Sequence, residues 1–332
     1  MNLNNLQDLQ QEVRSMGFNP KVADELEKNM KALPGYFTLK DQFPGDKGMV
    51  DMTLHFKKSG QSDNYSFNKF EVTAGKVPPT VENQQYMVIS ADKDKPDKFL
   101  VKNFDSPNEA LDFFKKQKGT SELAVGESVE AKQNLASMKD GKVNFINPDF
   151  RQAYFSPAVS QTFYLKDGKG FSANQAANLV QDRTVFRNDM MTRDGDSYKA
   201  WMRLDFDVKK DDFGNHKFKQ FHHPTYGFDM EKTLNAYKIK ELAEPEKKAE
   251  IMKAMSNGDR VAVTATGKDG KEAKVMAEVV PRYGKLNFFS EKGAALKREQ
   301  FTKTATVNNT QNQSKAQSQD KAQQHGQSRG IR

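Results

Sequence analysis

The sequence predicts an α+β fold made of two similar modules, each with a mainly antiparallel sheet and helices, followed by a disordered tail. Three observations support this. Alternating apolar and polar residues indicate strands, helical spacing with capping residues indicates helices, and short motifs recur in the same order in both halves. A chain of 332 residues also suits about two domains. The predicted ranges are 1–150 for the first module, 155–290 for the second and 293–332 for the tail.

The recurring motifs are collinear and nearly equally spaced. The main pairs, first-half copy first, are Gly17-Phe18 and Gly170-Phe171, Leu54-His55-Phe56 and Leu204-Asp205-Phe206, Glu130-Ala131-Lys132 and Glu272-Ala273-Lys274, and Gly141-Lys142 and Gly284-Lys285. Such collinearity favours an ancient duplication, although coincidence among common strand and turn patterns stays an alternative. Two copies are too few for a solenoid, so we expect two similar α+β modules.

In the first module, helical spacing covers residues 4–15 and 20–33, and Asn19-Pro20 provides a cap and a first turn. Ser106 and Pro107 open a further helix that runs to about residue 117. The strands expected from alternation and turn residues are 48–58, 63–73, 84–92, 97–103, 127–134 and 142–147.

The second module repeats this alternation of helices and strands. Its predicted helices are 172–181, capped by Ser172, then 229–237 and 245–256, with Pro245 at the start of the last one. Its predicted strands are 161–166, 197–208, 216–223, 259–266, 271–280 and 284–289.

The tail differs in composition from the rest of the chain. After Gly293 it is rich in Gln, Asn, Ser and Lys with almost no large apolar residue, so nothing offsets the entropy lost on ordering. Residues 291–332 hold eight Lys/Arg against three Asp/Glu, a large part of the net charge of +8. A basic tail of this kind either contacts nucleic acid or an acidic partner, or only solvates the chain, and the sequence leaves both open.

Several classes of site are excluded by composition. The chain has no cysteine, so it has no disulfide, thiolate nucleophile or cysteine metal site. Its first residues lack the basic start and apolar core of a secretion signal, and no apolar run approaches the roughly 20 residues of a membrane helix. We therefore expect a cytoplasmic protein without a membrane partner, and we predict no cofactor.

No catalytic constellation is visible. His222 and His223 adjoin on a predicted strand and point to opposite faces, so they cannot easily hold one metal ion. The sequence has no glycine-rich phosphate loop, and Tyr164 and the other tyrosines lack the basic or histidine neighbours of a tyrosine nucleophile. Asp205 and Asp207 share a strand face near a hairpin turn, where a solvated surface is favoured over a cation site. We predict no metal site, no catalytic residue and no enzymatic activity.

The stretch from Lys199 to Asp207 alternates strictly, with Ala200, Met202, Leu204 and Phe206 on one face. The only tryptophan of the chain, Trp201, falls on the other face between Lys199 and Arg203. An indole between two cations suits base stacking with phosphate contacts, or a pocket on a protein partner. Burial under a helix of its own module is the favoured alternative, because tryptophan is mostly buried. The predicted binding surface is Lys199, Trp201, Arg203, Lys217 and Lys219.

The second half resembles a family of uncharacterised domains encoded on conjugative and mobilisable elements of gut bacteria. The residues that carry the resemblance include Lys169-Gly170-Phe171, Ala177-Asn178-Leu179-Val180, Tyr198 to Phe206 and Tyr226-Gly227-Phe228-Asp229-Met230. The first half, from Gly17 through Phe67-Asn68-Lys69, is similar to the region that often precedes this domain. The family usually has Gly and Ala in a Leu-Leu-x-Gly-Arg-Ala-Val stretch, where this chain has Asp182 and Thr184.

The resemblance implies a setting beside transfer and DNA-processing genes, and it implies no particular activity. Together with the basic second half, it favours a non-enzymatic binding or accessory protein of a mobile element. The expected partners are single- or double-stranded DNA, or DNA-processing proteins of the element. A protein-interaction scaffold without nucleic-acid binding is the main alternative, and a metal-dependent hydrolase using the Asp205 region is the third.

Overall fold

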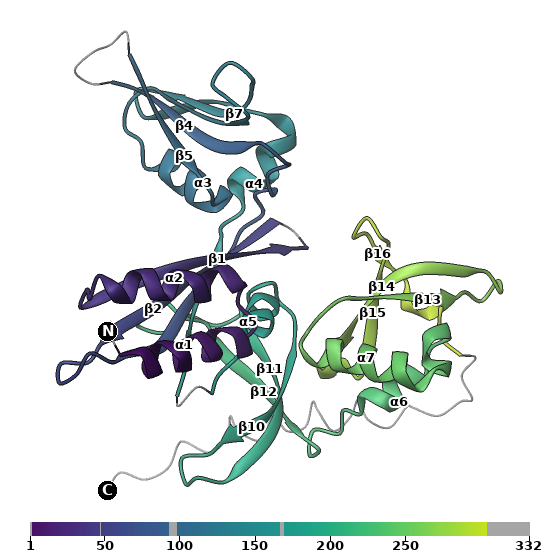
Figure 1. Cartoon of the computed structure of the whole chain (residues 1–332). Helices are drawn as coiled ribbons and strands as arrows, with labels where there is room; N and C mark the ends of the chain where they lie inside the picture. Colours follow the sequence, from purple (N-terminus) through teal and green to yellow (C-terminus); the bar gives the residue numbers. More distant parts are fainter. Residues whose placement is uncertain (1, 47, 93–97, 167–168, 304–332) are drawn as a thin grey trace, which may run out of the picture.

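The computed structural model describes residues 2–46, 48–92, 98–166 and 169–303. These residues form seven α-helices and four antiparallel sheets, which confirms the predicted α+β class. Figure 1 shows a central body (residues 2–76 and 159–223), a first lobe (77–158) and a second lobe (228–303). Each of the three has its own main apolar core.

The central body contains a four-stranded sheet of order β1-β2-β3-β9, with helices on one face (Figure 1). The strands are β1 (Tyr36–Gly45), β2 (Gly48–Lys58), β3 (Tyr65–Ala74) and β9 (Val159–Tyr164). The helices are α1 (Leu3–Ser15), α2 (Pro20–Lys31) and α5 (Ala173–Val180). Alternate residues of β2, including Leu54 and Phe56, are fully buried beneath these helices.

A second sheet of the central body packs against the same core. It consists of β10 (Val185–Met191), β11 (Ser197–Asp205) and β12 (Lys217–His223). Ala200, Met202 and Leu204 of β11 join the core of the four-stranded sheet, as the alternation predicts. Strand β9, from the predicted second module, pairs with β3 of the first. The two predicted modules therefore share one sheet and one apolar core, which extend across the predicted boundary at residues 150–155.

The first lobe is a five-stranded sheet of order β5-β4-β6-β7-β8 with helices packed on it. Its strands are β4 (Gln85–Ala91), β5 (Phe99–Phe104), β6 (Ser121–Gly126), β7 (Lys132–Lys139) and β8 (Lys142–Ile146). Its helical segments are α3 (Pro107–Lys115), η1 (Pro148–Phe150) and α4 (Arg151–Phe155).

The second lobe is a four-stranded sheet of order β13-β14-β15-β16 with two α-helices. Its strands are β13 (Val261–Thr266), β14 (Glu272–Val280), β15 (Lys285–Phe289) and β16 (Ala295–Leu296). Its helical segments are α6 (Met230–Asn235), η2 (Lys240–Ala243), α7 (Pro245–Ser256), η3 (Pro281–Tyr283) and η4 (Arg298–Gln300).

The predicted helix starts are confirmed in their capping chemistry. The Asn19 side chain accepts from the Lys21 amide, and Pro20 occupies the first turn of α2. Ser106 accepts from the Glu109 amide at α3, and Ser172 forms a capping box with Gln175 at α5. Local side-chain chemistry therefore sets where these three helices begin.

The order of elements agrees with the predicted repeat. Helix α2 followed by β1-β2-β3 matches helix α5 followed by β10-β11-β12, and α3-β6-β7-β8 matches α7-β13-β14-β15. Gly141 and Gly284 precede the last strand of each set, and both have a left-handed φ, of +72° and +59°. Duplication as the origin of this order stays a prediction.

Two sequence predictions require correction. Residues 293–303 are ordered and are not part of a disordered tail, because Phe301 is buried in the second-lobe core and Thr302 forms a bridge with Tyr237. The rest of the predicted tail, 304–332, lies outside the described residues. Strands β1, β6, β10 and β16 were not expected, and the strand expected at 127–134 begins instead at Lys132.

Asp182, at the position where glycine is expected from the family resemblance, has a backbone conformation that suits glycine. Asp182 follows α5 with φ +69°, one of four non-glycine residues with positive φ in the described part of the chain. Aspartate tolerates this left-handed conformation better than most residues do. Aspartate is therefore compatible with the backbone of this turn. Among the described residues, no helix has both the length and the apolar character needed to cross a bilayer.

Candidate functional site

The residues of the predicted surface lie on the paired strands β11 and β12, but the tryptophan side chain is not exposed there. Strand pairing places Lys199 opposite His223, Trp201 opposite Phe221 and Arg203 opposite Lys219. Trp201, however, is only 3% exposed. Its ring contacts Phe186 of β10 at 5.1 Å and Phe228, just before α6, edge-on at 5.2 Å.

Trp201 belongs to the core of the second lobe, so the predicted burial of the indole is confirmed. The rings that contact it lie on β10 and just before α6, and not on a helix as expected. The alternative, an exposed stacking platform, is wrong for this side chain. A buried ring between Phe186 and Phe228 cannot receive a base or a partner residue.

Two of the predicted cations are also engaged within the protein. Both contacts of Arg203 go to Asp182 Oδ1, at 3.0 and 2.7 Å. Lys219 contacts Asp205 at 2.9 Å and Asp207 at 3.2 Å, and its hydrogen bond is the main cause that lowers the pKa of Asp205. Lys199 and Lys217 are exposed. Asp205 and Asp207 therefore both form ion pairs with Lys219, which lies opposite Arg203.

The outer face of the β1-β2-β3-β9 sheet, opposite the helices, carries a set of aromatic and basic side chains that the sequence did not single out. Strand pairing places Thr38, His55, Lys69 and Tyr164 in one row across the four strands. Tyr36 lies opposite Lys57 at the same end of the sheet. Tyr36 is 53% exposed and Tyr164 61% exposed. They lie on the two edge strands of the sheet, β1 and β9, which are about 14 Å apart. We call Tyr36, His55, Lys57, Lys69 and Tyr164 the outer-face cluster.

A chain of polar contacts links the middle of this cluster. The Tyr36 hydroxyl contacts His55 Nδ1, and His55 Nε2 lies 3.2 Å from Glu71 Oε1. Lys69 binds the same Glu71 oxygen at 3.1 Å. Burial lowers the pKa of His55, since it outweighs the opposing effect of Glu71. Neutral His55 therefore helps to fix the Tyr36 ring at the edge of the sheet.

The first lobe covers the opposite end of the same sheet face. Asn108 of α3 donates to Asp51 Oδ2 at 2.6 Å and to the Met49 carbonyl at 3.1 Å. Gln42 donates to Asp51 Oδ1, and Lys40 binds Glu109 of α3. The end that holds the outer-face cluster is not covered by these contacts. Within the described residues, Lys57 is exposed and has no ion-pair partner.

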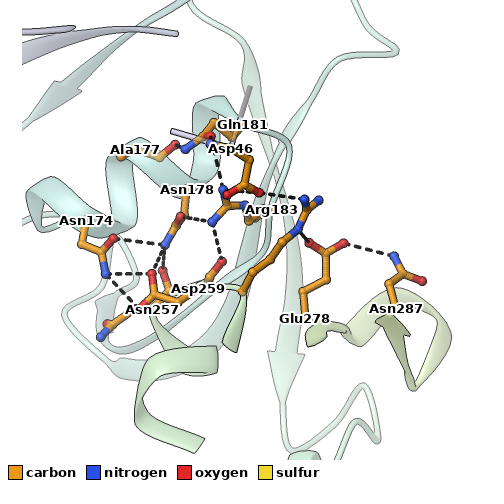
Figure 2. A network of polar contacts seen from close by, with 12 residues as sticks. Asp46, Asn174, Ala177, Asn178, Gln181, Arg183, Asn257, Asp259, Glu278 and Asn287 are labelled. Carbon is orange, nitrogen blue, oxygen red and sulfur yellow. Dashed lines mark hydrogen bonds and ion pairs between the residues drawn. The ribbon is translucent and has the colours of Figure 1, made fainter. Parts of the chain in front are cut away.

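A network of polar contacts connects the central body to the second lobe (Figure 2). Asp46 Oδ2 accepts from Arg183 and from Arg260, at 2.8 Å each, and Arg260 also binds Glu278 at 2.7 Å. Asn178 of α5 donates to Asp259 and to the Asn257 carbonyl, both at 2.7 Å.

This network suits a structural role. Arg183 is nearly buried, which lowers its pKa, but an arginine stays charged and must be paired. Each guanidinium meets a carboxylate, so the contacts hold the second lobe against the β1–β2 turn and α5. Within the part of the chain that the structure describes, no group of three His, Cys, Asp or Glu side chains could hold a metal ion.

Comparison of the chain with protein-family models, with curated proteins and with solved structures gives no match. The resemblance to mobile-element domains therefore stays a prediction.

Sequence reasoning missed the outer-face cluster because it missed β1. The signal was present in Tyr36-Phe37-Thr38-Leu39-Lys40, where Phe37 and Leu39 alternate with exposed residues.

Proposed function

We propose that the protein binds single-stranded nucleic acid on the outer-face cluster, as a non-enzymatic accessory factor in the DNA processing of a mobile element. The observation that carries this is the pair of exposed tyrosines, Tyr36 and Tyr164, on the edge strands with basic side chains between them. Stacking on aromatic rings with lysines along the backbone is how single strands are bound without sequence preference. The mobile-element setting comes from the family resemblance alone.

The position of the cluster supports a single strand over a duplex. Its rings lie on a sheet surface and not on a projecting helix or ribbon, so a base must leave its stack to contact them. Lys57, which has no ion-pair partner in the described part of the chain, provides a cation beside Tyr36, whereas Lys69 shares Glu71 with His55. We expect weak binding that depends strongly on salt, because only a few phosphates can be contacted.

The test is fluorescence anisotropy with a labelled oligothymidine of about 20 nucleotides and a matched duplex, from about 20 to about 300 mM NaCl. Tyr36→Ala and Tyr164→Ala should each weaken single-strand binding by about 5- to 100-fold, the loss of one stacked base. Tyr283→Ala, which removes a tyrosine of the second lobe that is 62% exposed, is the matched control and should change nothing. Lys57→Ala should reduce the salt slope by about 0.7.

Two outcomes would contradict the proposal: no binding by the wild type at the lowest salt, or equal losses in Tyr283→Ala and Tyr164→Ala. A chain ending at Lys303 separates the contribution of the basic tail from that of the cluster, and it keeps Phe301 in the second-lobe core. If this shortened chain loses all binding, the tail and not the sheet is the binding element.

A protein-interaction scaffold is the second candidate, and the edge strand β5 favours it. Phe99, Leu100 and Val101 are 64%, 60% and 45% exposed on the outer strand of the first-lobe sheet. Exposed apolar edge strands are sites of strand addition. Capture from cells that carry the element, repeated after nuclease treatment and with Val101→Lys, separates the candidates. A protein retained by the wild type and lost in the variant supports the scaffold.

A further inference from the structure

A cavity of about 280 Å³ opens at the edge of the central body, away from the outer-face cluster. It lies where the ends of β2, β3, β9, α5 and β11 meet, and Arg260 of the second lobe forms part of its wall. The residues that shape it are Val50, Ala74, Val159, Val180 and Phe206, with Asp46, Lys76, Asp182 and Arg260 at the rim. This volume lies just below the usual range of ligand pockets, about 300–1,000 Å³.

The floor of the cavity is apolar and well supported. Val50 is 1% exposed and Val180 3% exposed, so both are held by the central core behind them. Gly48 lines the wall at φ +144°, and a Cβ there would lie 2.7 Å from the carbonyl oxygens of Gly75 and Val77. Glycine is required at this close approach, which keeps side chains out of this part of the wall.

Most of the charged residues at the rim have an ion-pair partner, and one does not. Asp46 is bound by two arginines, and Arg203 binds Asp182. Arg260 binds Asp46 and Glu278 and lies over the Phe289 ring at 3.8 Å. Within the described residues, Lys76 is the one charged residue of the lining without an ion-pair partner. The charge left for a ligand is therefore positive.

We propose that this cavity binds a small organic anion, a carboxylate with a compact apolar body. The apolar body lies on Val50, Val159 and Val180, and the carboxylate meets Lys76 at the rim. Apolar contacts supply most of the affinity, and the lysine selects the negative end group. A cationic ligand would be repelled by Lys76 and would not be attracted by the carboxylates of the lining, which are already paired with arginines.

Binding should also stabilise the contact between the central body and the second lobe. Arg260 lines the cavity while it holds Asp46, so an occupant packs against the same ion pair. A ligand that binds only the folded chain raises its stability by about 1.4 kcal/mol at ten times Kd. A shift in Tm is therefore a direct readout of occupancy.

The test compares three probes of nearly equal shape: phenylacetate, phenylacetamide and phenethylamine. Ligand-observed NMR and thermal unfolding at up to about 10 mM probe measure their affinities for the full chain. We expect phenylacetate to bind at least about tenfold more tightly than phenethylamine, with the neutral amide between them.

Two variants locate the site. Lys76→Met should remove the preference of the cavity for phenylacetate over phenylacetamide, and Val159→Phe should weaken all probes by filling the cavity. Lys199→Met, on the far exposed end of β11, is the matched control and should change neither result. Lys76 is exposed, so its variant does not threaten folding if Val159→Phe proves unstable.

The proposal is overturned if no probe binds at about 10 mM, or if phenethylamine binds more tightly than phenylacetate. It is also overturned if Lys76→Met keeps the full preference for the carboxylate. If Val159→Phe folds and still binds the probes as the wild type does, the probes bind on another surface. That outcome also overturns the proposal.

Discussion

Asp51 and Trp201 occupy equivalent positions in the two halves of the chain. Each contacts one lobe, Asp51 through hydrogen bonds and Trp201 through apolar packing. Each lies on the middle strand of a three-stranded set, three residues before an inward-facing leucine, Leu54 or Leu204. Asp51 accepts hydrogen bonds from Asn108 of the first lobe and from Gln42. Trp201 instead packs against Phe228 in the second-lobe core.

The difference shows which part of the repeated unit is constrained by folding. The inward faces of β2 and β11 keep apolar residues because both contribute to one core. Their outward faces contact different lobes, so a carboxylate suits one contact and an indole the other. The first lobe is joined through directional hydrogen bonds and the Lys40–Glu109 ion pair. The second is joined through buried apolar area and a separate network of ion pairs and hydrogen bonds.

The largest expected effect comes from removing the indole. Trp201→Ala should lower the free energy of unfolding by about 3–5 kcal/mol, because a large buried ring is replaced by a cavity. Hydrogen exchange should rise in β13, β14 and β15 of the second lobe more than in β6 and β7 of the first. Tyr283→Ala, at an exposed ring, is the control. A loss of less than about 1 kcal/mol would mean that the indole does not hold the second lobe.

Removing the carboxylate at the equivalent position should have a smaller effect. Asp51→Asn should cost about 1–2 kcal/mol at neutral pH, because one donor of Asn108 or Gln42 then faces an amide nitrogen. Urea unfolding monitored by Trp201 emission measures this, and Asp194→Asn, at an exposed residue, is the control.

The pH dependence of the Asp51 contribution has a definite sign. Burial raises the pKa of Asp51, against the lowering by its hydrogen bonds to Asn108, Ser106 and Gln42. The folded state therefore binds this proton more tightly than the unfolded state, and the contribution of Asp51 decreases as pH rises from the unfolded pKa through the folded one. The deficit of Asp51→Asn should grow as pH falls from 7 towards 4. A deficit that shrinks would contradict a raised pKa.

Most of the helices and hairpins could be predicted from the sequence, because caps, turns and alternation act locally. Four strands were missed, and two of them, β1 and β10, hold the same place in the repeat, directly after a helix. Asp41 faces inward on β1, where it accepts from the Asn19 amide, and β10 has an irregularity after Arg187. Both interrupt the apolar alternation, and only tertiary contacts compensate for them.

The binding surface was less predictable than the fold. Sequence placed Lys199, Trp201 and Arg203 on one strand face correctly, but exposure depends on what covers that face, and Phe228 lies far along the chain from β11. Tyr36 and Tyr164 lie 128 positions apart in the sequence and share one sheet face only because β9 pairs with β3. Local patterns do not encode such pairings.

The smallest expected effect concerns Arg203, which neighbours Trp201 on the outward face and has Thr53 as its first-half equivalent. Asp182→Asn keeps a residue that tolerates φ +69° and removes only the ion pair with Arg203, so it should cost less than about 1 kcal/mol. Since the pair is partly exposed, salt screens it, and the difference from wild type should shrink between about 20 and 500 mM NaCl. Asp182→Ala should cost more, by about 1 kcal/mol, and this added cost should not depend on salt because it comes from the left-handed backbone. If the two variants lose equally at every salt concentration, the turn carries no backbone strain and the ion pair alone explains aspartate at this position.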